Sequence, residues 1–257
     1  MIHFVGAGPG APDLITVRGM NLLRSAGMVV YTGSLVNPEL LSCVPLGCEL
    51  RDSASMTLDE VIGALQDGFV RGLNVVRLHT GDPSLYGAVR EQMDRLEELG
   101  IPFEVVPGVS SLSAAAAALK AEYTLPGVSQ TLIVARMEGR TAVPEREKVR
   151  DLASHGASMV FFLSAGMLGE LCRQLVEGGY EPDTPAALVY KASWPEQRIL
   201  RATLADLPAR AEEAAIPGKT GLVLIGKFLA DDYETSRLYD ASFGHEFREA
   251  RNEDSGQ

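Results

Sequence analysis

The chain has 257 residues, 46% of them hydrophobic and 22% charged, which is enough to bury one large core or two smaller ones. Its formal net charge of -11, without any long run of Lys or Arg, argues against nucleic acid as a partner, because nucleic-acid binding usually exploits clustered positive charge. No stretch of about 18 apolar residues could span a bilayer, and the first residues lack the pattern of a signal peptide. We therefore expect a cytoplasmic protein with no membrane partner.

Short apolar runs alternate with amphipathic stretches of helical period, which is typical of an α/β protein. In the first half, the sequence predicts strands at 2–5, 28–32, 49–51, 74–79 and 103–106. Helices are expected between them. Thr57 and Glu60 form a capping box that predicts a helix ending at Gly72. Further helices are expected at 88–99, before Gly100, and at 112–120, where nearly all residues are small and apolar.

The alternation restarts after Pro126 and Gly127. We expect strands at 131–135, 159–163, 187–190, 198–203 and 221–225, and helices after Pro144 and at 168–177. The short connection at 191–196 predicts a hairpin, and therefore a mixed second sheet. The expected organisation is two α/β domains, each a sheet flanked by helices, at residues 1–122 and 123–230. Residues 231–257 are polar without a sustained period and predict a poorly ordered tail with no catalytic part.

The first strand runs into a glycine-rich loop at 6–13, and glycine permits close backbone approach. A dinucleotide fingerprint would require this loop to open directly into a helix and an acidic residue to end the second strand. Pro9 and Pro12 delay the expected helix until about Thr16, and the second strand ends in Thr32-Gly33 without an acid. NAD binding, or a purely structural turn, is thus a weaker interpretation than one that includes the other loops.

Two more glycine-containing loops, at 80–87 and 106–111, follow the strands predicted at 74–79 and 103–106. In open α/β sheets, ligands bind at the carboxyl ends of the strands. Together the three segments, GAGPGAPDL, TGDPSLYG and VPGVSS, resemble the tetrapyrrole methylase family over about residues 1–228. This resemblance implies S-adenosylmethionine as cofactor, held in a cleft between the two domains, and S-adenosylhomocysteine as product.

Other segments resemble the branch of the family that methylates C11 of precorrin-4 in cobalamin biosynthesis. They lie at 31–36, 79–82, 138–145 and 189–195. Thr80 stands where the uroporphyrinogen III branch typically has a second glycine. A different precorrin, cobalt-precorrin-4 or uroporphyrinogen III stay open as substrates. An NAD-dependent oxidoreductase and a binding protein without turnover stay open as other classes.

Carried over by position, the resemblance implies cofactor contacts on both domains. They are Pro9, Thr80, Gly81, Asp82, Leu85, Ser110, Ser111, Leu163, Ala192 and Gly221. Taken alone, Asp82-Pro83 is better explained as the start of a helix. Ser110 could cap the helix that follows it, a role that is compatible with ligand binding. The substrate implied by the family is rich in carboxylates, so basic and aromatic side chains in the matching segments are candidates to hold it. They are Tyr86, Arg136, Arg140, Lys191 and Trp194.

The residues show no constellation for covalent or metal catalysis. Cys43, Cys48 and Cys172 are odd in number and fit no metal-ligand spacing, and the four histidines are scattered. An activated methyl donor needs no nucleophilic side chain, because the protein mainly has to align two reactants and exclude water. We therefore expect no metal and name no catalytic residue. The small-residue helix at 112–120 and the family both point to a homodimer.

Overall fold

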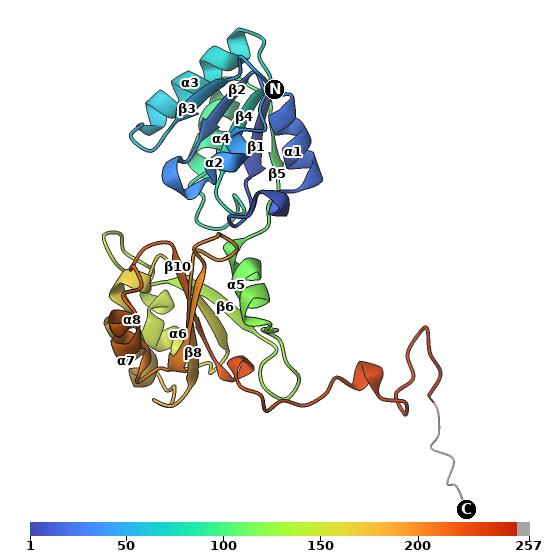
Figure 1. Ribbon diagram of the computed structural model, residues 1–257, viewed down its shortest axis with the longest axis vertical. Coiled ribbons are helices and arrows are strands. Elements are labelled where there is room, and N and C mark those ends of the chain that lie inside the picture. Colours follow the sequence, from blue (N-terminus) through green and yellow to red (C-terminus); the bar gives the residue numbers. More distant parts are fainter. Residues whose placement is uncertain (251–257) are drawn as a thin grey trace, which may run out of the picture. The chain divides into compact units, whose positions relative to one another are not determined.

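The computed structural model describes residues 1–250, which form two compact units. The first unit contains Met1–Leu119 together with Val189–Arg198. The second contains Lys120–Leu188 together with the described residues from Ile199 on. Each unit is a five-stranded sheet flanked by helices (Figure 1), so the expected α/β class with two sheets is confirmed.

The first sheet is parallel throughout. Its strands are β1 (Ile2–Gly6), β2 (Met28–Tyr31), β3 (Glu49–Asp52), β4 (Val75–His79) and β5 (Phe103–Val106), in the order β3-β2-β4-β1-β5. All five were predicted within two residues. Because parallel strands point the same way and β1 lies between β4 and β5, the loops that follow these three strands emerge side by side.

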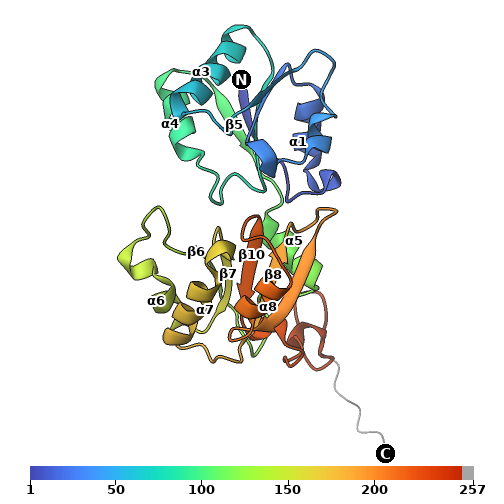
Figure 2. The same cartoon turned by 60° about the vertical axis from the view of Figure 1, so that its left-hand side comes forward.

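Helices cover both faces of the first sheet, as Figure 2 shows with α3 and α4 on one side and α1 on the other. Phe4, Val30 and Leu65 belong to the core under α3 (Leu58–Val70) and α4 (Arg90–Glu98). Val29 and Leu78 belong to the core on the opposite face. The remaining helices are α1 (Val17–Arg24), α2 (Pro38–Leu41) and α5 (Ser111–Leu119), with 3-10 turns at Pro12–Leu14 and Gly33–Leu35.

Local signals placed two of these helices correctly. The capping box is present, because the Thr57 hydroxyl accepts from the Glu60 amide and the Glu60 carboxylate accepts from the Thr57 amide. The first helix begins at Val17 with Thr16 as its N-cap, as Pro9 and Pro12 indicated. The four-residue helix α2 was not predicted, since it is too short to show a period.

The second sheet is mixed, as predicted. Its strands are β6 (Leu132–Arg136), β7 (Ser158–Phe162), β8 (Pro185–Tyr190), β9 (Arg198–Thr203) and β10 (Gly221–Ile225), in the order β6-β7-β10-β8-β9. β6 pairs with β7 in parallel, whereas β10 pairs with β7 in the antiparallel sense. Helices α6 (Val149–Ala153), α7 (Leu168–Glu177) and α8 (Leu207–Glu213) pack on one face of this sheet (Figure 1). The sequence had not predicted α8.

The described part of the carboxyl-terminal segment contains one short 3-10 turn, Arg237–Tyr239, and an isolated bridge between His245 and Arg248. The Arg248 guanidinium donates to the carbonyls of Leu238, Asp240 and Phe243, at 2.8, 2.6 and 3.2 Å. Residues 231–250 thus have local hydrogen bonding although nearly all are exposed. The rest of the predicted tail, 251–257, lies outside the described residues.

Candidate active site

Three loops meet at the carboxyl edge of the first sheet. They are residues 7–16 after β1, 80–88 after β4 and 107–110 after β5, and we call them the strand-end loops. The Gly8 amide donates to the Gly81 carbonyl over 3.3 Å, and the Gly81 amide donates to the Gly8 carbonyl over 2.9 Å. These reciprocal bonds form an isolated antiparallel bridge just beyond the parallel pair β1 and β4, and they fix the first two loops to each other.

Close packing of backbone on backbone explains the glycines in these loops. A Cβ atom added to Gly108 would lie 2.1 Å from the Gly81 carbonyl oxygen, and one added to Gly6 would lie 2.6 Å from the Gly108 Cα. Such distances are far inside van der Waals contact, and the obstructing atoms are backbone atoms that cannot rotate away. Any side chain at Gly6 or Gly108 would therefore push the strand-end loops apart.

Asp82 ties the second strand-end loop to the third. One carboxylate oxygen accepts from the Gly108 amide at 2.8 Å, while the other accepts from the Ser84 amide at 2.8 Å and from the Ser84 hydroxyl. Burial is the largest single influence on the pKa of Asp82 and raises it, but these hydrogen bonds together hold the pKa below its ordinary value. The carboxylate is therefore ionised at neutral pH and already engaged, so the backbone of this residue is the part left for a ligand.

The segment Val189–Arg198 belongs to the first unit and packs against the loop after β1. The Trp194 indole N–H donates to the Pro9 carbonyl at 3.0 Å, and the Ser193 hydroxyl accepts from the Ala11 amide at 3.0 Å. A Cβ atom on Gly10 would lie 2.1 Å from the indole ring. Two residues predicted for different roles, Pro9 for cofactor and Trp194 for substrate, are thus in direct contact.

Lys191 lies beside Trp194 in the same segment. Its ammonium is 5.0 Å from the centre of the indole ring and 3.5 Å from a Glu196 carboxylate oxygen. The side chain is only partly exposed, and the neighbouring Ala192 is buried. Among the residues that the structure describes, Glu196 is the one ion-pair partner of Lys191, and an ammonium has three donors, so this group can bind a further anion.

Polar contacts also fix the other residues predicted on the first unit. The Ser110 hydroxyl accepts from the Leu112 amide at 3.2 Å and so caps α5, which begins at Ser111. The Thr80 hydroxyl lies 3.1 Å from the Thr32 hydroxyl after β2, and the Leu85 amide donates to the Asp82 carbonyl at 3.3 Å. The cap that the sequence offered as an alternative role for Ser110 is confirmed.

On the second unit, three predicted residues lie at one edge of the second sheet. Arg136 ends β6 and pairs in register with Phe162, so Leu163 follows β7 at the same edge. Gly221 begins the antiparallel β10 at this end of β7. Arg140 lies in the exposed loop after β6. The Arg136 guanidinium donates to the carbonyls of Met137, Thr141 and Ala142. These hydrogen bonds hold the loop in place, and because carbonyls are neutral they leave the positive charge of Arg136 unpaired.

Left-handed backbone conformations concentrate near the predicted site residues. Tyr86, Lys191 and Ser193 have φ values of 55°, 47° and 69°, and in the second unit Leu163 and Thr220 have 56° and 58°. Residues with a Cβ rarely adopt such angles, and when they do the surroundings must hold them there. Leu163 is also 71% exposed. Strained positions with exposed apolar side chains are characteristic of ligand-binding segments.

Sequence reasoning missed several polar residues that support these loops. The Asn37 side chain is buried and donates to the Gly10 carbonyl at 2.8 Å. Arg77 and His79 on β4 and Gln92 on α4 are buried as well. In the sequence, Arg77 and His79 alternate with apolar residues along β4, which puts them on one face of a buried strand. That pattern is the signal that could have identified them.

His79 should make the stability of the protein fall in mild acid. The imidazole is 2% exposed and stacks on Phe4, and burial together with the nearby Arg77 lowers its pKa to about 3. The unfolded chain binds this proton below its ordinary pKa of 6.5, so stability is complete above that value and is lost as the pH falls toward 3. At pH 5 we expect a loss of about 2 kcal/mol relative to neutral pH from this residue.

Urea unfolding at pH 7 and pH 5, for the wild type and His79→Phe, measures this contribution. Phe cannot titrate and keeps an aromatic ring against Phe4, so the variant should lose about 2 kcal/mol less than the wild type between the two pH values. Equal losses in both proteins would contradict a buried neutral imidazole.

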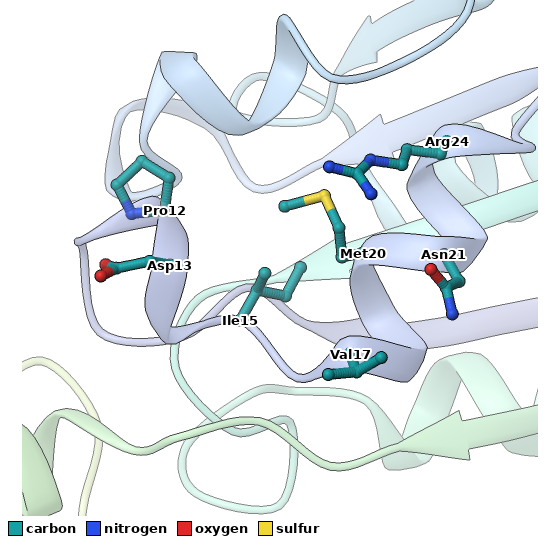
Figure 3. A pocket seen from close by; sticks show the side chains of 7 residues that line it. All are labelled: Pro12, Asp13, Ile15, Val17, Met20, Asn21 and Arg24. Atoms are coloured by element: carbon teal, nitrogen blue, oxygen red, sulfur yellow. The ribbon is translucent and has the colours of Figure 1, made fainter.

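A surface pocket of about 260 Å³ lies where the end of the loop after β1 meets α1 (Figure 3). It is formed by the 3-10 turn Pro12–Leu14 and by α1, with Asp13 and Arg24 on opposite sides. None of the predicted site residues lines it, so this pocket is not the candidate active site. Among residues 1–250 no three His, Cys, Asp or Glu side chains are grouped to bind a metal ion, and no helix is long and apolar enough to span a membrane.

Comparisons with known proteins agree with this geometry. The family model for tetrapyrrole (corrin/porphyrin) methylases matches residues 1–208. Cobalt-precorrin-4 C(11)-methyltransferase of Methanocaldococcus jannaschii is 48% identical, over 97% of this chain and 96% of its own length. Precorrin-4 C(11)-methyltransferase of Mycobacterium tuberculosis is 44% identical, over 94% of this chain and 96% of its own length.

Solved structures show the same fold. The X-ray structure of cobalt precorrin-4 methyltransferase, a cobalamin biosynthetic enzyme, has a TM-score of 0.87 and 44% identity, covering 89% of this chain and 95% of that chain. Uroporphyrin-III C-methyltransferase from Thermus thermophilus, in complex with S-adenosylhomocysteine, has a TM-score of 0.73 and 27% identity, covering 91% and 95%. With its parallel first sheet, its joined glycine loops and these matches, the chain belongs to the tetrapyrrole (corrin/porphyrin) methylase family.

Proposed function

We propose that this protein is an S-adenosylmethionine-dependent methyltransferase that methylates C11 of precorrin-4 to give precorrin-5 in cobalamin biosynthesis. The observation that carries the proposal is the match, at 44–48% identity over nearly the whole chain, to relatives that bear this activity in their names. The position of the strand-end loops agrees with this proposal, because they lie at the carboxyl ends of the strands, where open α/β sheets bind ligands. Trp194 and Lys191 lie beside the first of these loops.

For the cofactor, the fit rests on the backbone of the strand-end loops. The Asp82 carboxylate is already hydrogen-bonded to the loop after β5, and no acidic residue ends β2. This edge of the sheet therefore lacks the free carboxylate with which a dinucleotide site binds the ribose. Its glycines instead let the loops after β4 and β5 pack backbone against backbone. The Thr80 and Ser110 hydroxyls belong to the same two loops. Thr80, Gly81, Leu85 and Ser110 would bind the donor together with Pro9, Ser111 and Ala192. For Leu163 and Gly221 of the second unit, a donor contact stays a prediction from the family resemblance.

S-adenosylmethionine supplies an activated methyl group, so the protein need only bring the acceptor carbon in line with it and exclude water. Trp194 packs against the loop after β1 and donates a hydrogen bond to the Pro9 carbonyl, and Asp82 holds the loops after β4 and β5 together. These contacts fix the backbone that must position the donor. No side chain is assigned as a base.

For the substrate, local positive charge has to overcome the repulsion between a polycarboxylate and a chain of net charge -11. Within residues 1–250, Lys191 has one ion-pair partner, Glu196 at 3.5 Å, Arg140 has none, and Arg136 donates to neutral carbonyls. We assign these three as carboxylate ligands, with Tyr86 and Trp194 offering aromatic faces to the macrocycle.

Single substitutions Lys191→Ala and Arg140→Ala should each raise the Michaelis constant for the tetrapyrrole about three- to fivefold, the loss of one exposed or partly exposed ion pair. Steady-state kinetics with labelled S-adenosylmethionine measures this, and calorimetry with S-adenosylhomocysteine should give affinities within about twofold of wild type. Lys227→Ala removes an exposed lysine outside the predicted site and should change neither value. Equal losses of substrate and cofactor affinity in Lys191→Ala and Arg140→Ala would contradict the assignment.

The product decides the reaction. The protein is incubated with labelled S-adenosylmethionine and, in parallel, with precorrin-4, cobalt-precorrin-4 and uroporphyrinogen III, and the product's mass and methylation site are determined. One methyl group at C11 of precorrin-4 or of its cobalt form supports the proposal, and the preferred form tells whether cobalt is already inserted. Methylation only of uroporphyrinogen III, or affinity for NAD in place of S-adenosylhomocysteine, would refute it. A homodimer and a cytoplasmic location belong to the same proposal, and light scattering tests the former.

A further inference from the structure

A positive charge is buried beneath the loop after β4 without a carboxylate to pair with it. Arg77 is 4% exposed, and within residues 1–250 its guanidinium has no ion-pair partner. Its Nη1 donates to the Ser53 hydroxyl at 3.0 Å and to the Val30 carbonyl at 3.3 Å, and its Nε donates to the Gln92 side-chain oxygen at 2.9 Å. Burial lowers the pKa of Arg77 to about 10, so the group is still charged at neutral pH.

Gln92 connects Arg77 to the loop after β4 by hydrogen bonds. It is 6% exposed on α4, and because a guanidinium can only donate, the side-chain oxygen must face Arg77. The amide nitrogen is thereby turned toward the Ala88 carbonyl, to which it donates at 2.9 Å. A continuous set of hydrogen bonds thus leads from β2 and β4 through Arg77 and Gln92 to the end of the second strand-end loop.

The part of the loop that receives this bond is strained. Tyr86 and Ala88 have φ values of 55° and 48°, in the left-handed region that costs about 1–2 kcal/mol per residue with a Cβ. Gly87 between them packs so closely that a Cβ would lie 2.3 Å from the Pro83 carbonyl oxygen. Such a turn persists only where the surroundings hold it, and it presents Tyr86 with 44% of its surface exposed.

We propose that Arg77 and Gln92 are positioning residues, which hold the Tyr86–Ala88 turn so that Tyr86 meets the tetrapyrrole. The inference rests on the proposed function, since it assigns the turn to the substrate and not to the cofactor. The bond from Gln92 is the contact through which Arg77 acts, and loss of that bond releases the turn while the strand-end loops stay joined by Asp82 and by the pairing of Gly8 with Gly81.

Gln92→Glu separates this role from a structural one. The carboxylate still accepts from Arg77 and now pairs with its charge, so the melting temperature should be unchanged or raised. It cannot donate to the Ala88 carbonyl, so the turn loses its anchor. We expect a five- to twentyfold higher Michaelis constant for precorrin-4, with kcat and the affinity for S-adenosylhomocysteine within about twofold of wild type. Gln66→Glu makes the same change on the exposed face of α3 and should alter none of these values.

Hydrogen exchange supplies a readout that does not depend on the substrate. Amides of residues 84–89 should exchange faster in Gln92→Glu than in wild type, whereas those of Gly8, Gly81 and Gly108 should not. Unchanged exchange at 84–89 would overturn the anchoring claim whatever the enzyme methylates. Faster exchange with an unchanged Michaelis constant, or with an equal loss of cofactor affinity, would overturn the assignment of the turn to the substrate. A wild type that methylates no tetrapyrrole refutes the proposed function and with it the substrate role, while the exchange result still decides the anchor.

Discussion

Gly108→Ala is expected to abolish measurable binding of S-adenosylhomocysteine and to lower the free energy of unfolding by about 3 kcal/mol or more. The new methyl group would lie 2.1 Å from the Gly81 carbonyl oxygen and 2.8 Å from the Gly6 Cα. All of these are backbone atoms held by β1 and β4, so relief requires the loop after β5 to move away. The Asp82 bond to the Gly108 amide would break with that movement. Calorimetry and urea unfolding measure both effects.

Gly63→Ala is the matched control for this substitution. Gly63 lies inside α3, and no atom would come within 4 Å of an added Cβ. Alanine is the better helix former, so this variant should be more stable by up to about 1 kcal/mol and should bind S-adenosylhomocysteine normally. If Gly108→Ala behaved like Gly63→Ala, the close packing of the strand-end loops would have no part in cofactor binding.

The sequence predicted most strands well because they are short apolar runs bounded by glycine, proline or a polar turn, as at Ile2–Gly6 before its loop. It also predicted which strands carry glycine loops. It could not show that Gly108 packs on Gly81, because that contact joins residues far apart in the chain and depends on β1 lying between β4 and β5. Strand order is a property of the whole sheet, and no local pattern encodes it.

The same limit applies to the segment 189–198 and to the buried polar residues. Trp194 could be identified by its place in a motif, but its bond to Pro9 crosses most of the chain and left no trace in the local pattern. Gln92 was hidden for another reason. On an amphipathic helix a glutamine is usually solvated, and only the position of Arg77 beneath α4 makes this one a buried bridge.

Asp82→Asn should weaken S-adenosylhomocysteine binding about 100-fold and lower the free energy of unfolding by about 2–3 kcal/mol, although the side chain keeps its shape. Both carboxylate oxygens accept from backbone amides, one from Gly108 and the other from Ser84. In asparagine one of these atoms becomes an NH₂ group, which must then face an N–H donor and leave it unsatisfied. The wild-type advantage should disappear in acid. The pKa of Asp82 is lowered in the folded state, so its stabilisation is complete above the ordinary value of 3.8 and is lost as the pH falls below it.

Asp52→Asn separates this bridging role from an ordinary turn. Asp52 ends β3 and accepts from the Ala54 amide at 2.8 Å, the same local bond that Asp82 makes with Ser84, but the described contacts of its side chain include no second loop. Asparagine can keep such a local bond through its remaining oxygen. Asp52→Asn should therefore change stability by less than about 1 kcal/mol and leave cofactor affinity intact. Calorimetry and urea unfolding of the two variants side by side measure the difference. Similar small effects in both would mean that the loops after β4 and β5 are held together by the contact of their glycines alone, and that the Asp82 carboxylate serves only its own turn.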